Sequence, residues 1–166
     1  REVRMSELHG LSQRGGSVAV QVRFGENIYS PLVAQAQADL VLSLERNESL
    51  RNCYFASKKK TIFLLNDFSI FSPCFAGKKL LSLKKILAEI KPFSKKVYTI
   101  KASSVTQEEL GTDIVAGVYM LSGAVFMGLL PLNPANLLKA IKIMVPRGLE
   151  KNKKAFNLAE DNFKKL

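Results

Sequence analysis

Three short apolar runs, separated by helical patterns, constrain the fold of this chain more than any other feature. The runs cover residues 39–44, 61–66 and 96–100. Apolar runs of this length are typical of strands that are covered on both faces. Residues 45–54 are expected to form a short helix, and residues 82–92 a second one in which apolar side chains recur every three or four positions. Strands that alternate with helices favour an α/β fold with a parallel sheet.

The N-terminal part of the chain predicts a different kind of strand, because polar and apolar side chains alternate there. The two sets fall on opposite faces, with Val18, Val20, Val22 and Phe24 on one and Ala19, Gln21 and Arg23 on the other. This alternation is typical of a half-buried strand. Residues 25–27 form a turn signal, so residues 28–30 are expected to return as the second arm of an antiparallel hairpin. Residues 2–5 alternate more weakly and are expected to form a strand that enters the preceding loop.

Length and composition favour one domain covering residues 1–166. The chain shows no linker, repeat or low-complexity tract, and 47% of its residues are hydrophobic. Residues 1–16 lack the apolar core of a signal peptide, so we expect a cytoplasmic protein. Cys53 and Cys74 stand alone without a C-x-x-C partner. Because a cluster bound by thiolates usually draws on about four cysteines, this chain is not expected to hold an iron–sulfur cluster by itself.

The net charge of +11 is spread over short basic pairs and triplets at the ends of apolar segments. Such scattered lysines are typical of a solvated surface. Attraction to an acidic protein or to a phosphorylated cofactor is the alternative. Nucleic-acid binding is not expected, because no aromatic-rich RNA-binding motif accompanies the charges.

The segment 114–132 contains no charged residue and reaches the length of a membrane-spanning helix. Its glycines and other small residues dilute the hydrophobicity, Pro131 ends it, and no basic cluster flanks it closely. We therefore expect a helix buried in the domain or at a permanent subunit interface.

Local signals predict three further helices in the second half. Thr106 and Glu109 have the spacing of a capping box, and Gly111 is expected to end that short helix. Asn133 followed by proline predicts the start of the next helix. Its apolar face is expected to contain Leu137, Leu138, Ile141 and Met144. Residues 150–166 form an amphipathic pattern with Phe156, Ala159 and Phe163 on one side.

His9 is the only histidine of the chain, which leaves few options for acid–base chemistry. As a general acid or base it would need a partner, and Glu7 lies two residues away. A local hydrogen-bonding role that shapes the loop is the favoured interpretation. We expect no catalytic residue and no metal site in this chain.

Arg14, Gly15 and Gly16 form the best candidate for a binding site. Adjacent glycines let backbone N–H groups approach an anion, while a guanidinium offers a bidentate fork. A tight turn, with Arg14 paired to a carboxylate of a neighbouring subunit, explains the pattern equally well. Ser30, followed by proline, forms a rigid bend that either faces the same ligand or ends a strand. The chain contains no P-loop, no G-x-G-x-x-G and no serine-nucleophile elbow.

A longer pattern surrounds these residues and carries a family resemblance. The run His9-Gly10-Leu11-Ser12-Gln13-Arg14-Gly15-Gly16-Ser17-Val18 precedes VRFG at 22–25 and SPL at 30–32. It resembles the gamma subunit or domain of 2-oxoacid:acceptor (pyruvate, ketoisovalerate or indolepyruvate ferredoxin) oxidoreductases. Within that group it is most similar to the small (beta) subunit of indolepyruvate oxidoreductase. Residues 110–130 and 152–158 agree with the family in the same order.

The resemblance implies a Rossmann-like, mostly parallel sheet with helices on both faces and an antiparallel hairpin. The family normally opens with a strand and a G-x-G-G-Q-G turn, whereas this chain starts at Arg1. We therefore expect the N-terminal strand and Gly-rich turn to be missing from this sequence.

The function that the resemblance implies is oxidative decarboxylation of a 2-oxoacid to an acyl-CoA, with ferredoxin as electron acceptor. Thiamine diphosphate and the iron–sulfur clusters are expected on partner subunits, and an aryl pyruvate such as indolepyruvate is the favoured substrate. This chain is expected to support assembly and the coenzyme A region, through Gln13, Arg14, Gly15, Gly16 and Ser30. In isolation it is expected to be inactive and could form a homodimer. The alternatives are a nucleotide- or partner-binding α/β protein outside a redox complex, and a purely structural spacer.

Overall fold

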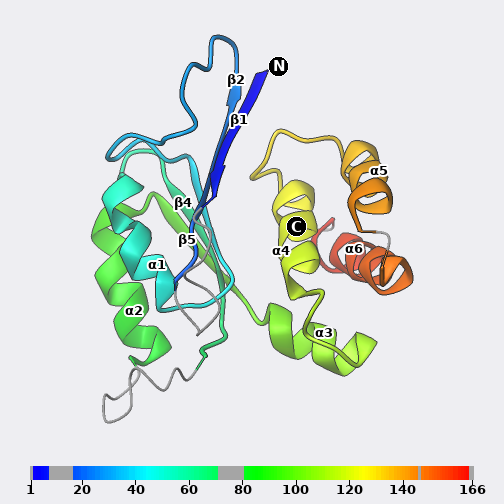
Figure 1. Cartoon of the computed structure of the whole chain (residues 1–166). Coiled ribbons are helices and arrows are strands. Elements are labelled where there is room, and N and C mark those ends of the chain that lie inside the picture. Colours follow the sequence, from blue (N-terminus) through cyan, green and yellow to red (C-terminus); the bar gives the residue numbers. More distant parts are fainter. Residues whose placement is uncertain (1, 8–16, 71–80, 146, 165–166) are drawn as a thin grey trace.

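The fold is a parallel sheet between two layers of helices, with a separate antiparallel hairpin at its N-terminal end (Figure 1). The computed structural model describes residues 2–7, 17–70, 81–145 and 147–164. In Figure 1, α1 and α2 lie on one side of the sheet, and α4, α5 and α6 lie on the other.

The three predicted runs form the parallel sheet. The strands are β3 (Leu40–Ser43), β4 (Ile62–Asn66) and β5 (Lys96–Ile100), in the order β3-β4-β5. Both pairings are parallel. The α/β prediction is therefore confirmed.

Helical segments connect these strands, as the pattern predicts. The first connection holds α1 (Glu48–Arg51) and the 3-10 helix η2 (Asn52–Phe55) in place of one helix over 45–54. The second holds α2 (Leu83–Ile90) and the 3-10 helix η4 (Lys91–Phe93). Ser82 caps α2, because its Oγ accepts a hydrogen bond from the Lys85 N–H at 3.3 Å.

The central strand β4 is buried on both faces. Phe63, Leu64 and Leu65 have no exposed area. Phe63 and Leu65 pack in the cluster that also contains Val41 and Ile90, whereas Leu64 packs with the helices on the other side. Successive side chains of a strand point to opposite faces, so this one strand anchors both helical layers.

The second half of the chain forms the other helical layer. Its helices are α3 (Ala102–Leu110), α4 (Ala116–Phe126), α5 (Pro134–Met144) and α6 (Leu149–Phe163). The uncharged run forms α4, and the prediction of a buried helix is confirmed, since Tyr119, Met120 and Ala124 are all buried. Within the described ranges, no helix combines the length and the apolar character needed to cross a bilayer.

Two local predictions in this layer are wrong in detail. Thr106 does not cap a helix but lies inside α3, where its buried hydroxyl donates to the Ala102 carbonyl at 2.9 Å. Gly111 does end α3, in the left-handed conformation with φ of +68°. Met144 does not join the buried face of α5, because it is the last residue of the helix and is 76% exposed.

The remaining predictions for α5 and α6 are confirmed. Asn133 Oδ1 accepts a hydrogen bond from the Ala135 N–H at 2.8 Å, and Pro134 is the first residue of α5. In α6, the predicted apolar residues are buried, namely Phe156, Ala159 and Phe163.

The antiparallel hairpin exists, but its second arm is not residues 28–30. Instead, β2 (Val20–Gly25) pairs with β1 (Glu2–Glu7), with Met5 opposite Val22. Residues 28–30 are held by side chains of the hairpin, because Glu2 Oε2 accepts from the Ile28 N–H at 3.0 Å. The chain does reverse at residues 25–27, but the backbone partner of β2 is β1.

The strand is half-buried as predicted, and the face that is covered is the polar one. On the polar face, Gln21 and Arg23 are half-buried, whereas the valines of β2 on the other face are exposed. Gln21 Oε1 accepts from the Val33 N–H at 2.7 Å, so the segment that follows the hairpin lies on the polar face. The alternation is confirmed, but it is the polar side that this chain covers.

Close packing between α4 and α6 generates a stability prediction. A Cβ added to Gly123 would lie 2.9 Å from the Phe163 ring, which is closer than side chains tolerate. We expect Gly123→Ala to lower the free energy of unfolding by about 1–2 kcal/mol, because the ring must shift in a packed core. Urea unfolding followed by circular dichroism measures the change.

Gly117→Ala is the matched control in the same helix. A Cβ there would make only an ordinary contact, 3.8 Å from the Leu44 side chain. Alanine should raise helix stability there by about 0.5–1 kcal/mol. Equal stability of the two variants would contradict the packing argument.

Candidate functional site at the carboxyl edge of the sheet

The polar residues that follow the parallel strands meet at one edge of the sheet. Asn66 at the end of β4 lies opposite Ile100 at the end of β5, and Ser43 at the end of β3 lies opposite Leu65. Ligands of open α/β sheets bind in the crevice outside the carboxyl ends of the strands. This edge is therefore the place to examine for a site.

Asn66 connects the ends of the strands. Its side chain is almost completely buried, and its Nδ2 donates to the Leu44 carbonyl at 3.0 Å and to Ser103 Oγ at 2.9 Å. Its Oδ1 accepts from the Ser103 N–H at 3.3 Å. One amide thus joins the segment after β3 to the first turn of α3.

An ion pair lies next to this amide. Arg46 Nη1 donates to Asp67 Oδ1 at 2.9 Å, and only about a fifth of each side chain is exposed. The backbone supports the same contact, since the Arg46 N–H donates to the Phe68 carbonyl at 3.0 Å. Arg46 Nε is buried without a hydrogen-bond partner among the described residues. The guanidinium therefore has a donor at this edge that the described residues leave unused.

Glu45 and Asn47 extend the network to the start of α1. Asn47 Nδ2 donates to Glu45 Oε1 at 2.6 Å and to Ser69 Oγ at 2.8 Å. The other carboxylate oxygen, Glu45 Oε2, accepts from the Glu48 N–H at 2.9 Å. Because Glu45 satisfies an N–H at the first turn, α1 begins only at Glu48. This explains why the helix predicted over 45–54 starts later.

The end of the predicted binding loop contacts this network. Ser17 Oγ donates a hydrogen bond to Glu48 Oε2, at the first residue of α1. The other oxygen of that carboxylate lies 3.3 Å from Arg51 Nε. The chain that leads from the loop into β2 is therefore fixed at the carboxyl edge.

Most of the site residues predicted from the sequence lie outside the described residues, namely His9, Gln13, Arg14, Gly15 and Gly16. Ser30 is described. Its Oγ accepts from the Leu32 N–H at 3.2 Å, and its carbonyl accepts from Arg23 Nη1 at 2.9 Å. Ser30 thus shapes a turn against the hairpin, and its role in ligand binding stays a prediction.

The sequence prediction missed the residues that form the polar network, namely Glu45, Arg46, Asn47, Asn66, Asp67 and Ser103. A signal for them exists, because Glu45–Asn47 and Asn66–Asp67 directly follow two of the apolar runs. The described parts of the chain contain no group of three or more His, Cys, Asp or Glu side chains that could hold a metal ion. The network is suited to positioning and hydrogen bonding.

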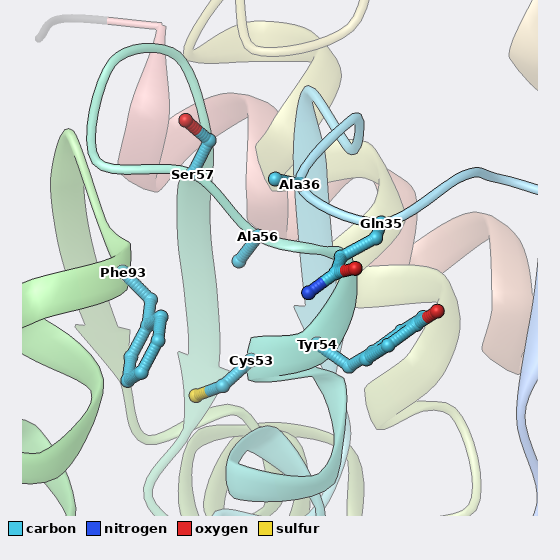
Figure 2. Close-up of a pocket in the computed structure, with 7 residues that line it drawn as sticks. All are labelled: Gln35, Ala36, Cys53, Tyr54, Ala56, Ser57 and Phe93. Atoms are coloured by element: carbon cyan, nitrogen blue, oxygen red, sulfur yellow. The ribbon is translucent and has the colours of Figure 1, made fainter.

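A hollow of about 500 Å³ lies at the opposite edge of the sheet (Figure 2). The Phe93 ring and the Cys53 sulfur lie toward one side of it, and Gln35 and Tyr54 toward the other. None of its lining residues is charged, the remainder being Ala36, Ala56 and Ser57. Burial, with the nearby Glu89 carboxylate, raises the pKa of the Cys53 thiol. Because the thiolate is the nucleophilic form, a raised pKa makes the Cys53 thiol less reactive than an ordinary one.

The family of the chain follows from comparison with known proteins. Residues 1–161 match the family model described as pyruvate ferredoxin/flavodoxin oxidoreductase. The chain belongs to this family. The indolepyruvate oxidoreductase subunit IorB of Pyrococcus horikoshii is 32% identical, over 95% of this chain and 79% of that protein. The subunit of the same name from Thermococcus kodakarensis is 30% identical, with the same coverage of 95% and 79%.

Solved structures of family members share the fold. The pyruvate oxidoreductase subunit PORC of Thermotoga maritima superposes with a TM-score of 0.60 at 16% identity, over 96% of this chain and 79% of that one. The gamma subunit of a keto/oxoacid ferredoxin oxidoreductase from Geobacter sulfurreducens gives 0.62 at 18% identity, with the same coverage of 96% and 79%. The resemblance expected from the QRGGSV run and the α/β prediction are both confirmed.

The Asn66 contacts generate a prediction about the site's rigidity. We expect Asn66→Ala to lower the free energy of unfolding by about 2–3 kcal/mol, because buried partners lose their hydrogen bonds. Asn136→Ala, on the exposed surface of α5, is the matched control and should change stability by less than about 0.5 kcal/mol. Chemical unfolding curves of both variants measure the difference. Similar losses in the two variants would refute the role of Asn66.

The raised pKa of Cys53 generates a second prediction. In a Cys74→Ser background, alkylation of native protein by iodoacetamide should reach its half-maximal rate at a higher pH than alkylation of urea-unfolded protein. The reason is that only the thiolate reacts, and folding disfavours the charged form. By linkage, the folded state should lose stability as the pH rises above the ordinary thiol pKa of about 8.5. Identical pH profiles for native and unfolded protein would contradict this account.

Proposed function

We propose that this chain is a subunit of a thiamine diphosphate-dependent 2-oxoacid:ferredoxin oxidoreductase complex. In the proposed reaction, the carboxylate form of a 2-oxoacid and coenzyme A give an acyl-CoA, carbon dioxide and one proton. The two electrons released pass to two oxidised ferredoxins. The observation that carries the proposal is the family match over residues 1–161.

The identity of the substrate is the finer part of the proposal. Two relatives at 30% identity or more are named as indolepyruvate oxidoreductase subunits, which supports an aryl pyruvate such as indolepyruvate. We expect the pocket for the aryl group on the catalytic partner subunit.

Our proposal for the cofactors is based on the side chains that the described residues offer. Bound thiamine diphosphate would supply the stabilised carbanion on which decarboxylation depends. Its magnesium needs oxygen donors, and the carboxylates of the described edge are already committed, Asp67 to Arg46 and Glu45 to Asn47 and the Glu48 N–H. These residues do not fit the thiamine site. We propose that thiamine diphosphate and the iron–sulfur clusters lie on partner subunits.

Coenzyme A is the ligand proposed for this chain. Gln13, Arg14, Gly15 and Gly16 offer backbone N–H groups and a guanidinium for its phosphates. The contact between Ser17 and Glu48 supports the proposal, because it fixes the end of this segment at the edge where ligands of α/β sheets bind. Ser30 remains a further candidate in the same proposal.

The rival function is a nucleotide- or partner-binding protein outside a redox complex. Purification of the native protein without any thiamine-dependent partner would favour that rival. Purification of a complex that reduces ferredoxin with a panel of 2-oxoacids would establish the proposed function and its preferred substrate.

The coenzyme A proposal predicts the effect of one substitution. In the whole complex, Arg14→Ala should raise the KM for coenzyme A by about tenfold or more, because a charge-assisted contact to phosphate is lost. The KM for the 2-oxoacid should stay unchanged. Steady-state ferredoxin reduction at varied coenzyme A concentration measures both.

Arg147→Ala is the control, since Arg147 is exposed in the turn before α6, away from the carboxyl edge. It should leave both KM values unchanged. If Arg14→Ala leaves the coenzyme A KM at the wild-type value, the loop does not bind this ligand.

A further inference from the structure

The fold brings together lysines that lie far apart in the sequence. The Thr61 carbonyl accepts from the Lys95 N–H at 2.8 Å, so the turn at residues 57–60 lies beside the segment that enters β5. The lysines gathered at this amino edge of the sheet, which we call the lysine rim, are Lys58, Lys59, Lys91 and Lys95. All of them are exposed, and none forms an ion pair with another residue of the described ranges.

The neighbouring charges leave the rim positive. Lys60 is paired with Asp39 Oδ1 at 3.1 Å, so these two charges offset each other. Lys96 Nζ lies 4.5 Å from the centre of the Tyr98 ring, which packs with the helices on the other side of the sheet. Glu89, the exposed carboxylate beside the thiol of the hollow, is a single negative charge against the rim. The positive charge is therefore local to this edge.

The lysine rim borders the hollow of Figure 2. Ser57 and Phe93 line the hollow, and each lies within two positions of a rim lysine. Figure 2 shows the Phe93 and Tyr54 rings toward opposite sides of the hollow, and these side chains are 43% and 59% exposed. No lining residue is charged. An uncharged hollow with accessible aromatic rings is thus bordered by unpaired positive charge.

This arrangement favours a protein as the occupant. Protein interfaces combine an apolar, often aromatic centre with a polar or charged rim. A small ligand is normally enclosed on most of its surface, whereas the two rings here are largely open to solvent. A nucleic-acid strand is less favoured, because Asp39 and Glu89 place carboxylates beside the lysines that would follow its backbone.

We propose that the hollow and the lysine rim form the docking site for an acidic segment of a partner protein. The segment places one large apolar side chain in the hollow and its carboxylates against the rim. The uncharged lining requires the apolar side chain, and the unpaired lysines require the carboxylates. The site lies at the opposite edge of the sheet from the contact between Ser17 and Glu48, so the inference goes beyond the proposed function and does not depend on it.

The probe is the synthetic peptide EDEFEDE, blocked at both ends and titrated at low ionic strength into the full chain labelled with nitrogen-15. Amide chemical shifts give the Kd and the place of contact, which we expect at Tyr54 and Phe93. Two matched peptides separate the contributions, because EDEAEDE keeps the charges without the ring and QNQFQNQ keeps the ring without the charges. Each should bind at least about fivefold more weakly than EDEFEDE, since one loses apolar burial and the other loses charge attraction.

Two matched pairs of substitutions test the location. The test pair is Lys58→Gln with Lys95→Gln, and the control pair is Lys139→Gln with Lys142→Gln on the exposed surface of α5. Both pairs remove the same net charge, so only its position differs. The test pair should raise the Kd for EDEFEDE at least about fivefold, and the control pair less than about twofold, because attraction between exposed charges is short-ranged in salt. Both should unfold at the wild-type urea midpoint, since the side chains are exposed.

Several results would overturn the inference. Equal Kd values for EDEFEDE and EDEAEDE would mean charge attraction without occupation of the hollow. Equal effects of the two lysine pairs, shifts away from the hollow, or no binding of EDEFEDE would exclude the site. Tighter binding of an oligothymidylate of the same length at the same residues would assign the surface to nucleic acid. The proposed function would stand in each case, because its test is the KM for coenzyme A.

Discussion

The burial of β4 on both faces is the constraint on which the rest of the structure depends. Phe63, Leu64 and Leu65 have no exposed area, so helices must cover both sides of the sheet. With both faces closed, the carboxyl ends of the strands are where polar groups of three segments can converge. Asn66, the last residue of the same strand, joins them through its hydrogen bonds to Leu44 and Ser103. The core and the candidate site are thus consecutive parts of one strand.

The two edges of the sheet differ in chemistry. The carboxyl edge contains the Arg46–Asp67 ion pair, the hydrogen bonds of the Asn66 amide, and the Glu45 carboxylate that accepts from the N–H of Glu48. Ser17, at the end of the predicted binding loop, donates a hydrogen bond to Glu48 at the same edge. The opposite edge carries an uncharged hollow lined by Cys53, whose pKa is raised by burial. This hollow is therefore a weaker guide to function than the convergence of hydrogen-bonding groups at the carboxyl edge. For a family whose relatives are named as subunits, a rigid polar edge is suited to completion by another chain.

The hairpin shows what alternation in a sequence can predict and what it cannot. The period of two in residues 18–24 correctly separates the valines from Gln21 and Arg23. Alternation says only that the two faces differ, and which face is covered depends on distant contacts such as that between Gln21 and Val33. The Thr106 capping signal failed for a related reason. A hydroxyl can satisfy a helix start or bond back to a carbonyl within a helix, and only the position of α3 decides between them.

The sequence by itself determined the three parallel strands, the helices between them, the buried helix after residue 114 and the family. These follow from periodicity and local end signals, which are properties of neighbouring residues. The tertiary structure alone decided that β1 pairs with β2, that Val20 and Val22 are exposed, and that Arg46 contacts Asp67 across 21 positions of the chain. These contacts depend on strand order and register, and they form only once the buried strands have brought distant segments together.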